Sequence, residues 1–386
     1  MKKMLNFSVG PVQMDEETLS LGSNQIPYFR TEEFSALMKE NEKLLCRFFD
    51  APENSRVVFM TGSGTASMEG GVMNFFDSSD NVLVVNGGSF GSRLVELCQI
   101  HGIPFTEIKL DFGKPLTSEI LSRYENHGYT GFLIQLCETS SGVLFDMNLI
   151  GKFCRRNGIF LFVDAVSGFM ADEFSMRKMH VNAAITGSQK ALSLPPSMSF
   201  TVMDEKAVAR AQKMNVKNLY FNYPLYIKNG ERGQTPFTPA VAILIMLNDR
   251  LKRIEKSGGI KVQNEIMRNR AKYFREKIKH LPFEMFVDGK NASNCVTALR
   301  PENPSVNAHK IFEILKDEYG IWICPNGGDY AEKVFRVGHI GSIKKSEIDR
   351  LLKALKQVAT KNITNISGGG ISNIYFKSPS VSSIAA

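Results

Sequence analysis

Two apolar stretches, each leading to a charged residue, set the first expectation about the fold. Residues 159–163 are all apolar and lead into Asp164, and residues 183–185 lead through Thr, Gly, Ser and Gln to Lys190. Unbroken apolar runs of this kind are typical of strands that are covered on both faces, as in a parallel sheet. We therefore predict two strands whose carboxyl ends bring Asp164 and Lys190 into one crevice.

Apolar runs and helical patterns alternate along the first two thirds of the chain. The pattern predicts further strands at 56–60, 82–85 and 131–137, and helices at 66–76 and 240–256. Alternation of this kind is typical of an α/β protein in which helices flank a mostly parallel central sheet. We predict this architecture for a large domain that spans residues 1–257.

A Ser-Gly-Gly sequence at 257–259 predicts the boundary to a smaller α+β domain, residues 258–360. Its expected helices are 262–279, 308–319 and 345–356, and its expected strands are 296–299, 321–323 and 334–337. The segment 218–232 is rich in Asn, Tyr and Gly and predicts a loop over the pocket. Residues 361–386 are rich in Asn, Ser and Gly, which predicts a flexible tail.

Composition and charge exclude several classes of protein. The 386 residues are 43% hydrophobic and carry a net charge of +8, from 47 basic and 39 acidic side chains. Glutamates interrupt the basic helical pattern after residue 252, so a solvated helix face explains the charge better than nucleic-acid binding. No apolar run is long enough for a membrane span, and no cluster of metal ligands is present. The six cysteines show no CxxC spacing, so we expect reduced core residues of a cytoplasmic protein.

Lys190 and Asp164 together suggest a specific chemistry. A lysine after a strand is most often a solvated surface group. In a buried crevice with cationic neighbours, however, the free amine is favoured and can form an imine with an aldehyde. A carboxylate close to such a lysine suggests pyridoxal phosphate, because the carboxylate keeps the pyridine nitrogen protonated and the ring can then accept electrons.

Several motifs resemble one enzyme family. The sequences Val-Asp-Ala-Val-Ser at 163–167 and Thr-Gly-Ser-Gln-Lys-Ala-Leu at 186–192 resemble the class V aminotransferases of the fold-type I pyridoxal phosphate enzymes. The similarity runs from about residue 6 to residue 359. It is greatest to the alanine–glyoxylate (serine–pyruvate) and 2-aminoethylphosphonate–pyruvate transaminases. The resemblance implies a homodimer with shared active sites that binds pyridoxal phosphate, with Lys190 and Asp164 as its catalytic residues.

A glycine-rich turn follows the predicted strand at 56–60. The sequence Thr-Gly-Ser-Gly-Thr at 61–65 opens a helix, and a helix N-terminus presents backbone N–H groups to an anion. On its own this turn could also belong to a nucleotide-binding protein, although its spacing is not G-x-G-x-x-G. The resemblance implies that Ser63, Gly64 and Thr65 hold the cofactor phosphate, and that Gln189 also touches it.

The resemblance assigns four more residues, each of which also has a structural explanation. Phe90 is either a core aromatic or a ring stacked on the cofactor. Thr139 would hydrogen-bond the phenolic oxygen of the cofactor. Thr238 is either a helix N-cap before Pro239 or a residue that reaches the phosphate in the neighbouring subunit. Gly10 lies in a Gly-Pro turn, and the family places this turn beside the substrate pocket, so residues 1–20 are expected to line the active site.

Arg336 lies in an otherwise apolar strand, Phe-Arg-Val-Gly at 335–338. A buried guanidinium needs an anion, which could be an internal carboxylate or a ligand. The resemblance assigns it to the carboxylate of the substrate, which a guanidinium fork matches in shape.

The predicted reaction is therefore transamination. A small amino donor (alanine, serine or 2-aminoethylphosphonate) would give its amino group to a 2-oxo acid such as pyruvate or glyoxylate. Related lyases and cysteine desulfurases share this fold, and the latter use a cysteine on a mobile loop. Cys324 follows a predicted strand and precedes Pro325, which is a structural setting. An oxidoreductase that binds a dinucleotide and a non-catalytic scaffold are two further alternatives.

Overall fold

The computed structural model describes residues 4–359 and residue 361. The predicted tail, 361–386, thus lies outside the described residues except for Lys361. No helix among the described residues has both the length and the apolar character needed to cross a membrane.

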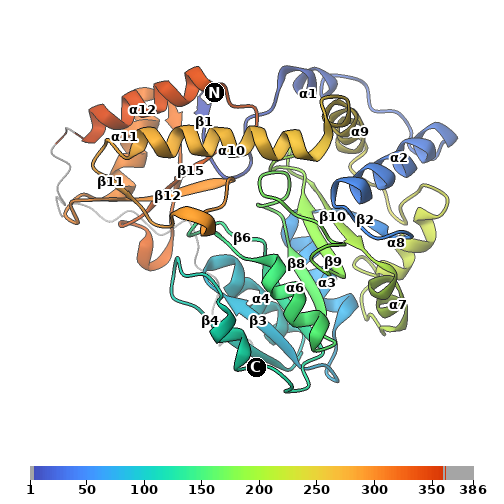
Figure 1. Ribbon diagram of the computed structural model, residues 1–386. Helices are drawn as coiled ribbons and strands as arrows, with labels where there is room; N and C mark the ends of the chain where they lie inside the picture. The colour runs from blue at the N-terminus through green and yellow to red at the C-terminus, as the bar shows by residue number, and fades with distance from the viewer. Residues whose placement is uncertain (1–3, 360, 362–386) are drawn as a thin grey trace, which may run out of the picture.

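A seven-stranded sheet forms the centre of the larger part of the molecule (Figure 1). Five neighbouring strands are parallel, whereas β10 runs antiparallel to both of its neighbours. In spatial order the strands are β2 (Arg56–Thr61), β10 (Met198–Met203), β9 (Ala183–Gly187), β8 (Phe160–Asp164), β5 (Gly131–Gln135), β3 (Val82–Asn86) and β4 (Phe105–Lys109). The predicted α/β fold with a mostly parallel sheet is confirmed.

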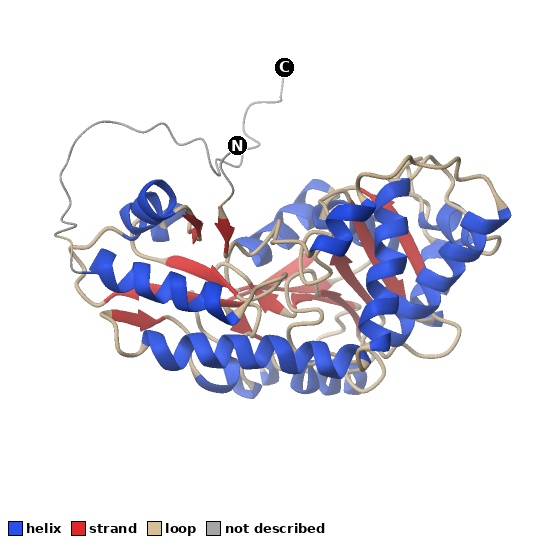
Figure 2. Cartoon of the chain, turned by 90° about the horizontal axis from the view of Figure 1, so that it is seen from above, coloured by secondary structure: helices blue, strands red, loops and turns tan. Residues whose placement is uncertain are grey.

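Helices cover both faces of this sheet (Figure 2), which explains the unbroken apolar runs in its strands. On one face lie α3 (Gly64–Phe75), α4 (Ser89–Ile100), α7 (Glu205–Lys213) and α8 (Tyr223–Gly230). On the other lie α2 (Glu32–Phe48), α5 (Ser118–Ser122), α6 (Met147–Arg156) and α9 (Val241–Lys256). Alternate residues of each strand enter the two cores, as Phe162 and Val163 of β8 do.

A second sheet of four antiparallel strands lies in the C-terminal part of the chain. It consists of β11 (Phe283–Met285), β12 (Val296–Pro301), β15 (Phe335–Gly338) and β14 (Cys324–Pro325). Three helices pack with it around a separate apolar core: α10 (Gly259–Ile278), α11 (Ala308–Tyr319) and α12 (Lys345–Ala359). Two short 3-10 helices lie at Gly289–Asn291 and Gly328–Tyr330. The domain boundary at residue 257 stays a prediction.

The N-terminal segment joins the two parts of the chain. Strand β1 (Leu5–Asn6) pairs in parallel with β13 (Ile321–Trp322), and Phe7 enters the core of the C-terminal part. Ten residues further on, α1 (Glu16–Leu21) packs against α9. The segment between β1 and α1 thus spans from one part to the other.

Three details differ from the predictions. The segment 218–232 is not a loop throughout, because α8 forms within it and buries Tyr223, whose hydroxyl lies 2.9 Å from Thr201 Oγ1. The strand predicted at 131–137 stops at Gln135. There the chain bends, and Cys137–Glu138 (β6) pairs instead with Val143–Leu144 (β7).

The N-cap of α9 is the third difference. Helix α9 begins at Val241 with Ala240 as its N-cap, so Thr238 does not cap it. The N–H of Ala240 is bound instead by the hydroxyl of Thr61, at 3.2 Å.

Candidate active site

Lys190 follows β9 and is buried against the N-terminal segment. Its side chain is 7% exposed, and Nζ donates a hydrogen bond to the carbonyl oxygen of Val9 at 2.6 Å. Burial lowers the pKa of the Lys190 amine below its ordinary value, and the nearby charge of Arg336 also lowers it, whereas Asp164 opposes the shift. Lys190 is therefore buried and is not a solvated surface lysine.

Gly10 touches the lysine side chain directly. It has φ +129°, and a Cβ atom at this position would lie 2.7 Å from Cδ of Lys190. Any other residue would be strained in this conformation and would also displace the lysine. The structure thus brings Gly10 and Lys190 together.

Asp164 ends β8, beside β9, and lies close enough to Lys190 for their charges to interact. It is 6% exposed, and its Oδ1 accepts a hydrogen bond from the N–H of Val166 at 2.9 Å. Burial raises the pKa of this carboxyl to about 6, while the Val166 hydrogen bond and the charge of Lys190 act in the opposite direction. The two groups predicted from the strand ends thus interact electrostatically.

Helix α4 begins beside these strand ends, and a buried carboxylate holds its first turn. Glu138 is fully buried and accepts hydrogen bonds from the backbone N–H groups of Phe90 (3.2 Å) and Gly91 (3.1 Å). A carboxylate at a helix N-terminus is favourable because it pairs free N–H groups and complements the dipole. Phe90 is held at this site half-buried, with the guanidinium carbon of Arg93 5.2 Å from its ring centre.

The start of α3 has the features of an anion cradle. Ser63 is the N-cap, but its side chain is exposed and caps no N–H group. Gly64 is buried, and a Cβ there would lie 2.9 Å from a methyl group of Val166, next to Asp164 in the chain. The hydroxyl of Thr65 accepts a hydrogen bond from Arg93 at 3.3 Å. A cradle with uncapped N–H groups and a cation beside it suits a phosphate.

Arg336 belongs to β15 of the second sheet and lies close enough to Lys190 to affect the pKa of its amine. It is 8% exposed and donates to the carbonyl oxygens of Pro325 (2.7 Å) and Thr139 (3.2 Å). None of the ion pairs among residues 4–359 includes Arg336, and its Nε has no hydrogen-bond partner. Among the described residues, Arg336 therefore has carbonyl oxygens but no carboxylate as partners.

Buried polar atoms without a partner mark the same region. Within the described residues, such side-chain atoms belong to three residues: Gln135, Gln189 and Arg336. Gln189 and Arg336 were predicted from the sequence. Gln135 was missed, although it ends an apolar run just as Asp164 does, and this signal could have identified it.

Two further predicted residues have different surroundings. The hydroxyl of Thr139 donates to Ser167 Oγ at 2.6 Å, and the carbonyl oxygen of the same threonine accepts from Arg336. Thr238 is exposed, and no hydrogen bond or ion pair found in the described part of the chain links it to Lys190 or Arg336. The structure therefore does not place Thr238 in the crevice of its own chain.

These residues fit pyridoxal phosphate. A buried amine with a lowered pKa can join its aldehyde, and a buried carboxylate can face its ring nitrogen. An uncapped helix N-terminus can bind its phosphate. Gln189 Oε1 and Arg336 Nε are also buried polar atoms that have no hydrogen-bond partner among the described residues.

Comparison with known proteins agrees with this assignment. The family described as "Aminotransferase class-V" matches residues 24–351. The chain is 29% identical to the soluble hydrogenase 42 kDa subunit of Anabaena cylindrica, across 92% of this chain and 93% of that protein. It is 26% identical to the 2-aminoethylphosphonate–pyruvate transaminase of Pseudomonas aeruginosa, across 77% of this chain and 80% of that protein.

Among solved structures, the alanine–glyoxylate aminotransferase of Nostoc sp. matches with a TM-score of 0.87 at 25% identity. This similarity covers 93% of this chain and 96% of that structure.

Proposed function

The chain belongs to the class V aminotransferase family, which is pyridoxal phosphate-dependent and of fold type I. We propose that it transfers the amino group of a small donor (alanine, serine or 2-aminoethylphosphonate) to a 2-oxo acid such as pyruvate or glyoxylate. The observation that carries this proposal is the buried Lys190, whose lowered pKa and proximity to Asp164 and Arg336 combine a base, a ring partner and an anion site.

Lys190 acts as the base. Bound pyridoxal phosphate supplies an electron-accepting ring that stabilises the carbanion of the substrate. Because burial favours the neutral amine, Lys190 can take the proton from Cα of the donor and would return it to the carbon of the cofactor that receives the amino group. The Val9 carbonyl and Gly10 fix the position of Nζ, and Asp164 offers a carboxylate to the protonated ring nitrogen.

Other predicted residues hold the cofactor and substrate. Ser63, Gly64 and Thr65 bind the phosphate through the N-terminus of α3, and Gln189 contributes its side chain. Phe90 would stack on the ring, and the hydroxyl of Thr139 would bind its phenolic oxygen. The guanidinium of Arg336, anchored by two carbonyl oxygens, binds the carboxylate of the substrate.

We also propose a homodimer in which Thr238 of one subunit reaches the phosphate held by the other. Two exposed apolar side chains in segments that contact residues 235–237 support this. Tyr28 is 71% exposed and Leu219 is 70% exposed. Tyr28 lies two residues before Arg30, which binds the carbonyl oxygen of Thr235. Leu219 precedes Tyr220, whose ring stacks on Phe237, next to Thr238. Exposed apolar patches of this kind are typical of protein interfaces.

A lyase of the cysteine desulfurase type is the second candidate. Cys324 lies directly opposite Arg336 in the pairing of β14 with β15, and it is close enough to Lys190 to affect the pKa of the amine. Its position in a hydrogen-bonded strand is unlike a mobile loop, which favours transamination. The two functions can be told apart by their co-substrates, since a transaminase needs a 2-oxo acid and a desulfurase does not.

The test is a spectroscopic screen of the purified holoenzyme. Alanine, serine and 2-aminoethylphosphonate are added in turn, and the visible band of the bound cofactor is recorded. We expect at least one donor to bleach the band, and pyruvate or glyoxylate to restore it. Lys190→Ala should abolish this cycle, whereas the surface variant Lys152→Ala should retain it.

Two outcomes contradict the proposal. Turnover by Lys190→Ala at the wild-type rate would exclude the lysine as the base. Release of sulfur from cysteine without any oxo acid, lost in Cys324→Ser, would establish the lyase instead.

A further inference from the structure

Gln135 is a buried amide without a partner. It is the last residue of β5 and is 0% exposed. Neither its Nε2 nor its Oε1 has a hydrogen-bond partner within the described residues. A buried amide in this state costs free energy, and a protein seldom leaves one unpaired unless a ligand or a functional group uses it.

The register of the sheet places Gln135 beside Asp164. The two residues are direct partners in the parallel pairing of β5 with β8. Leu133 and Phe162, two positions before each of them, both enter the core beneath α3 and α4. Since side chains alternate between faces, Gln135 and Asp164 project from the same face of the sheet, on strands about 4.8 Å apart.

Asp164 has an oxygen that such an amide can reach. Its Oδ1 accepts from Val166, and the hydrogen bonds of the described residues include none to Oδ2. Burial disfavours the charge on Asp164, and Glu138 adds repulsion, whereas Lys190 and Arg93 favour the charge. The anionic carboxylate therefore gains from one more donor.

We propose that Gln135 is a positioning residue for Asp164, whose amide N–H donates to the free carboxylate oxygen and holds it ionised toward the cofactor ring. The inference deepens the proposed function, because it depends on the assignment of Asp164 to the cofactor.

The test combines Gln135→Leu with two measurements on one protein. Leucine fills a similar volume without polar atoms, so apoenzyme unfolding by urea should show a stability equal to or above that of the wild type. Titration of the apoenzyme with pyridoxal phosphate should show about tenfold weaker binding. The pH at which binding fails on the acid side should rise by about one unit. Ile134→Val, on the opposite face of the same strand, is the matched control and should leave cofactor affinity unchanged.

A second variant, Gln135→Glu, places a carboxyl group beside Asp164. We expect its cofactor affinity to approach that of the wild type at acid pH, where the glutamate can donate, and to fall as the pH rises. This pH dependence tests the inference even if Gln135→Leu does not fold.

Unchanged cofactor affinity and an unchanged pH limit in Gln135→Leu, or pH-independent affinity in Gln135→Glu, would overturn the inference. A wild-type protein that binds no pyridoxal phosphate would instead overturn the proposed function, so the two failures are distinguishable.

Discussion

Arg336 shows how a single residue joins the second sheet to the active-site crevice. Its Nη atoms are anchored to the carbonyl oxygens of Pro325 and Thr139, while its Nε has no hydrogen-bond partner in the part of the chain that the structure describes. Carbonyl oxygens orient a guanidinium but do not neutralise it. The remaining charge is therefore available for the carboxylate of a substrate.

We expect Arg336→Gln to raise the KM for alanine and pyruvate by about 100-fold, because charge-assisted hydrogen bonds contribute about 1.5–3 kcal/mol. Arg336→Lys should recover only part of this loss, because an ammonium group cannot form the two-pronged contact. Steady-state kinetics measure both effects, and cofactor titration should show unchanged affinity. Arg300→Gln is the control, since this exposed arginine pairs with Glu284 in the same sheet. An unchanged KM in Arg336→Gln would place the substrate carboxylate elsewhere.

At the residue scale, a buried polar side chain can be recognised from the sequence when it interrupts or ends an apolar run. Asp164 and Arg336 stand out in this way, and each is buried. Thr238 does not cap α9, because the hydroxyl that accepts from the N–H of the N-cap residue Ala240 belongs to Thr61, which is far away in the sequence. Local rules for helix capping cannot identify such a partner.

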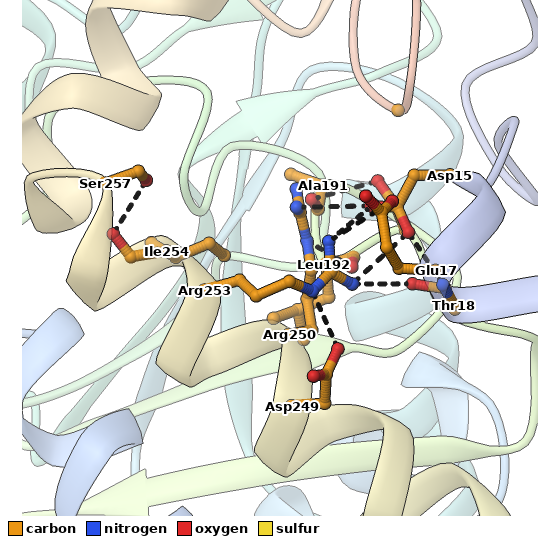
Figure 3. Close-up of polar contacts among 12 residues, drawn as sticks. Asp15, Glu17, Thr18, Ala191, Leu192, Asp249, Arg250, Arg253, Ile254 and Ser257 are labelled. Carbon is orange, nitrogen blue, oxygen red and sulfur yellow. Dashed lines mark hydrogen bonds and ion pairs between the residues drawn. The ribbon is translucent and has the colours of Figure 1, made fainter. Parts of the chain in front are cut away.

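At the element scale, a network of ion pairs fixes the N-terminal segment (Figure 3). Asp15 caps α1 by accepting from the N–H of Thr18 at 2.8 Å, and it also pairs with Arg250 and Arg253 of α9. Arg250 in turn donates to the carbonyl oxygen of Leu192, two residues after Lys190. This network stabilises the position of the segment that contacts the lysine.

Asp15→Asn should lower the free energy of unfolding by about 1–2 kcal/mol at pH 7. Burial acts to raise the pKa of Asp15, but hydrogen bonds from Arg253 and Thr18 outweigh it and lower the pKa to about 2. A lowered pKa contributes stability above the ordinary value near 3.8, and this contribution is lost as the pH falls toward 2.

Urea unfolding of wild type and Asp15→Asn at pH 7 and near pH 2.5 measures this prediction. Glu17→Gln is the control, because Glu17 is exposed and lies 4.0 Å from Arg253, so its effect should stay within about 0.5 kcal/mol. A stability difference that is as large near pH 2.5 as at pH 7 would show that the charge of Asp15 is not responsible.

Most elements were predictable because their own residues carry the periodicity. Helix α8 is the exception, since its Asn- and Tyr-rich sequence has no clear apolar period. It forms because Tyr223 is buried and its hydroxyl and backbone bind Thr201 and Asn74, which belong to other elements. Tertiary contacts of this kind override local preference and cannot be read from a short window.

At the scale of the whole molecule, Asp172 joins the two parts of the chain. It is 1% exposed and lies in the connection after β8. Its carboxylate accepts hydrogen bonds from the hydroxyl of Ser293 and the N–H of Asn294, just before β12, and its carbonyl oxygen accepts from Asn264 of α10 at 2.9 Å. Sequence analysis did not identify this residue, because its partners lie more than 90 positions away.

The pH dependence of stability should report this contact. Burial raises the pKa of Asp172 to about 6, although its hydrogen bonds and the charge of Arg275 act against the shift. The folded protein thus binds more protons here than the unfolded chain between about pH 4 and 6. Ionisation of Asp172 therefore costs stability as the pH rises through this window, by an amount on the order of 3 kcal/mol.

Asp172→Asn keeps the shape of the side chain but stays neutral at every pH, and an amide can donate to Ser293 and accept from Asn294. Relative to this variant, we expect the wild type to lose about 3 kcal/mol of unfolding free energy between pH 4 and pH 7. Urea unfolding of both proteins at the two pH values gives this difference, and groups common to both proteins cancel. Asp111→Asn, at an exposed position, should show no such change. If the difference between wild type and Asp172→Asn is the same at both pH values, Asp172 does not bear a destabilised charge, and its hydrogen bonds alone account for the contact.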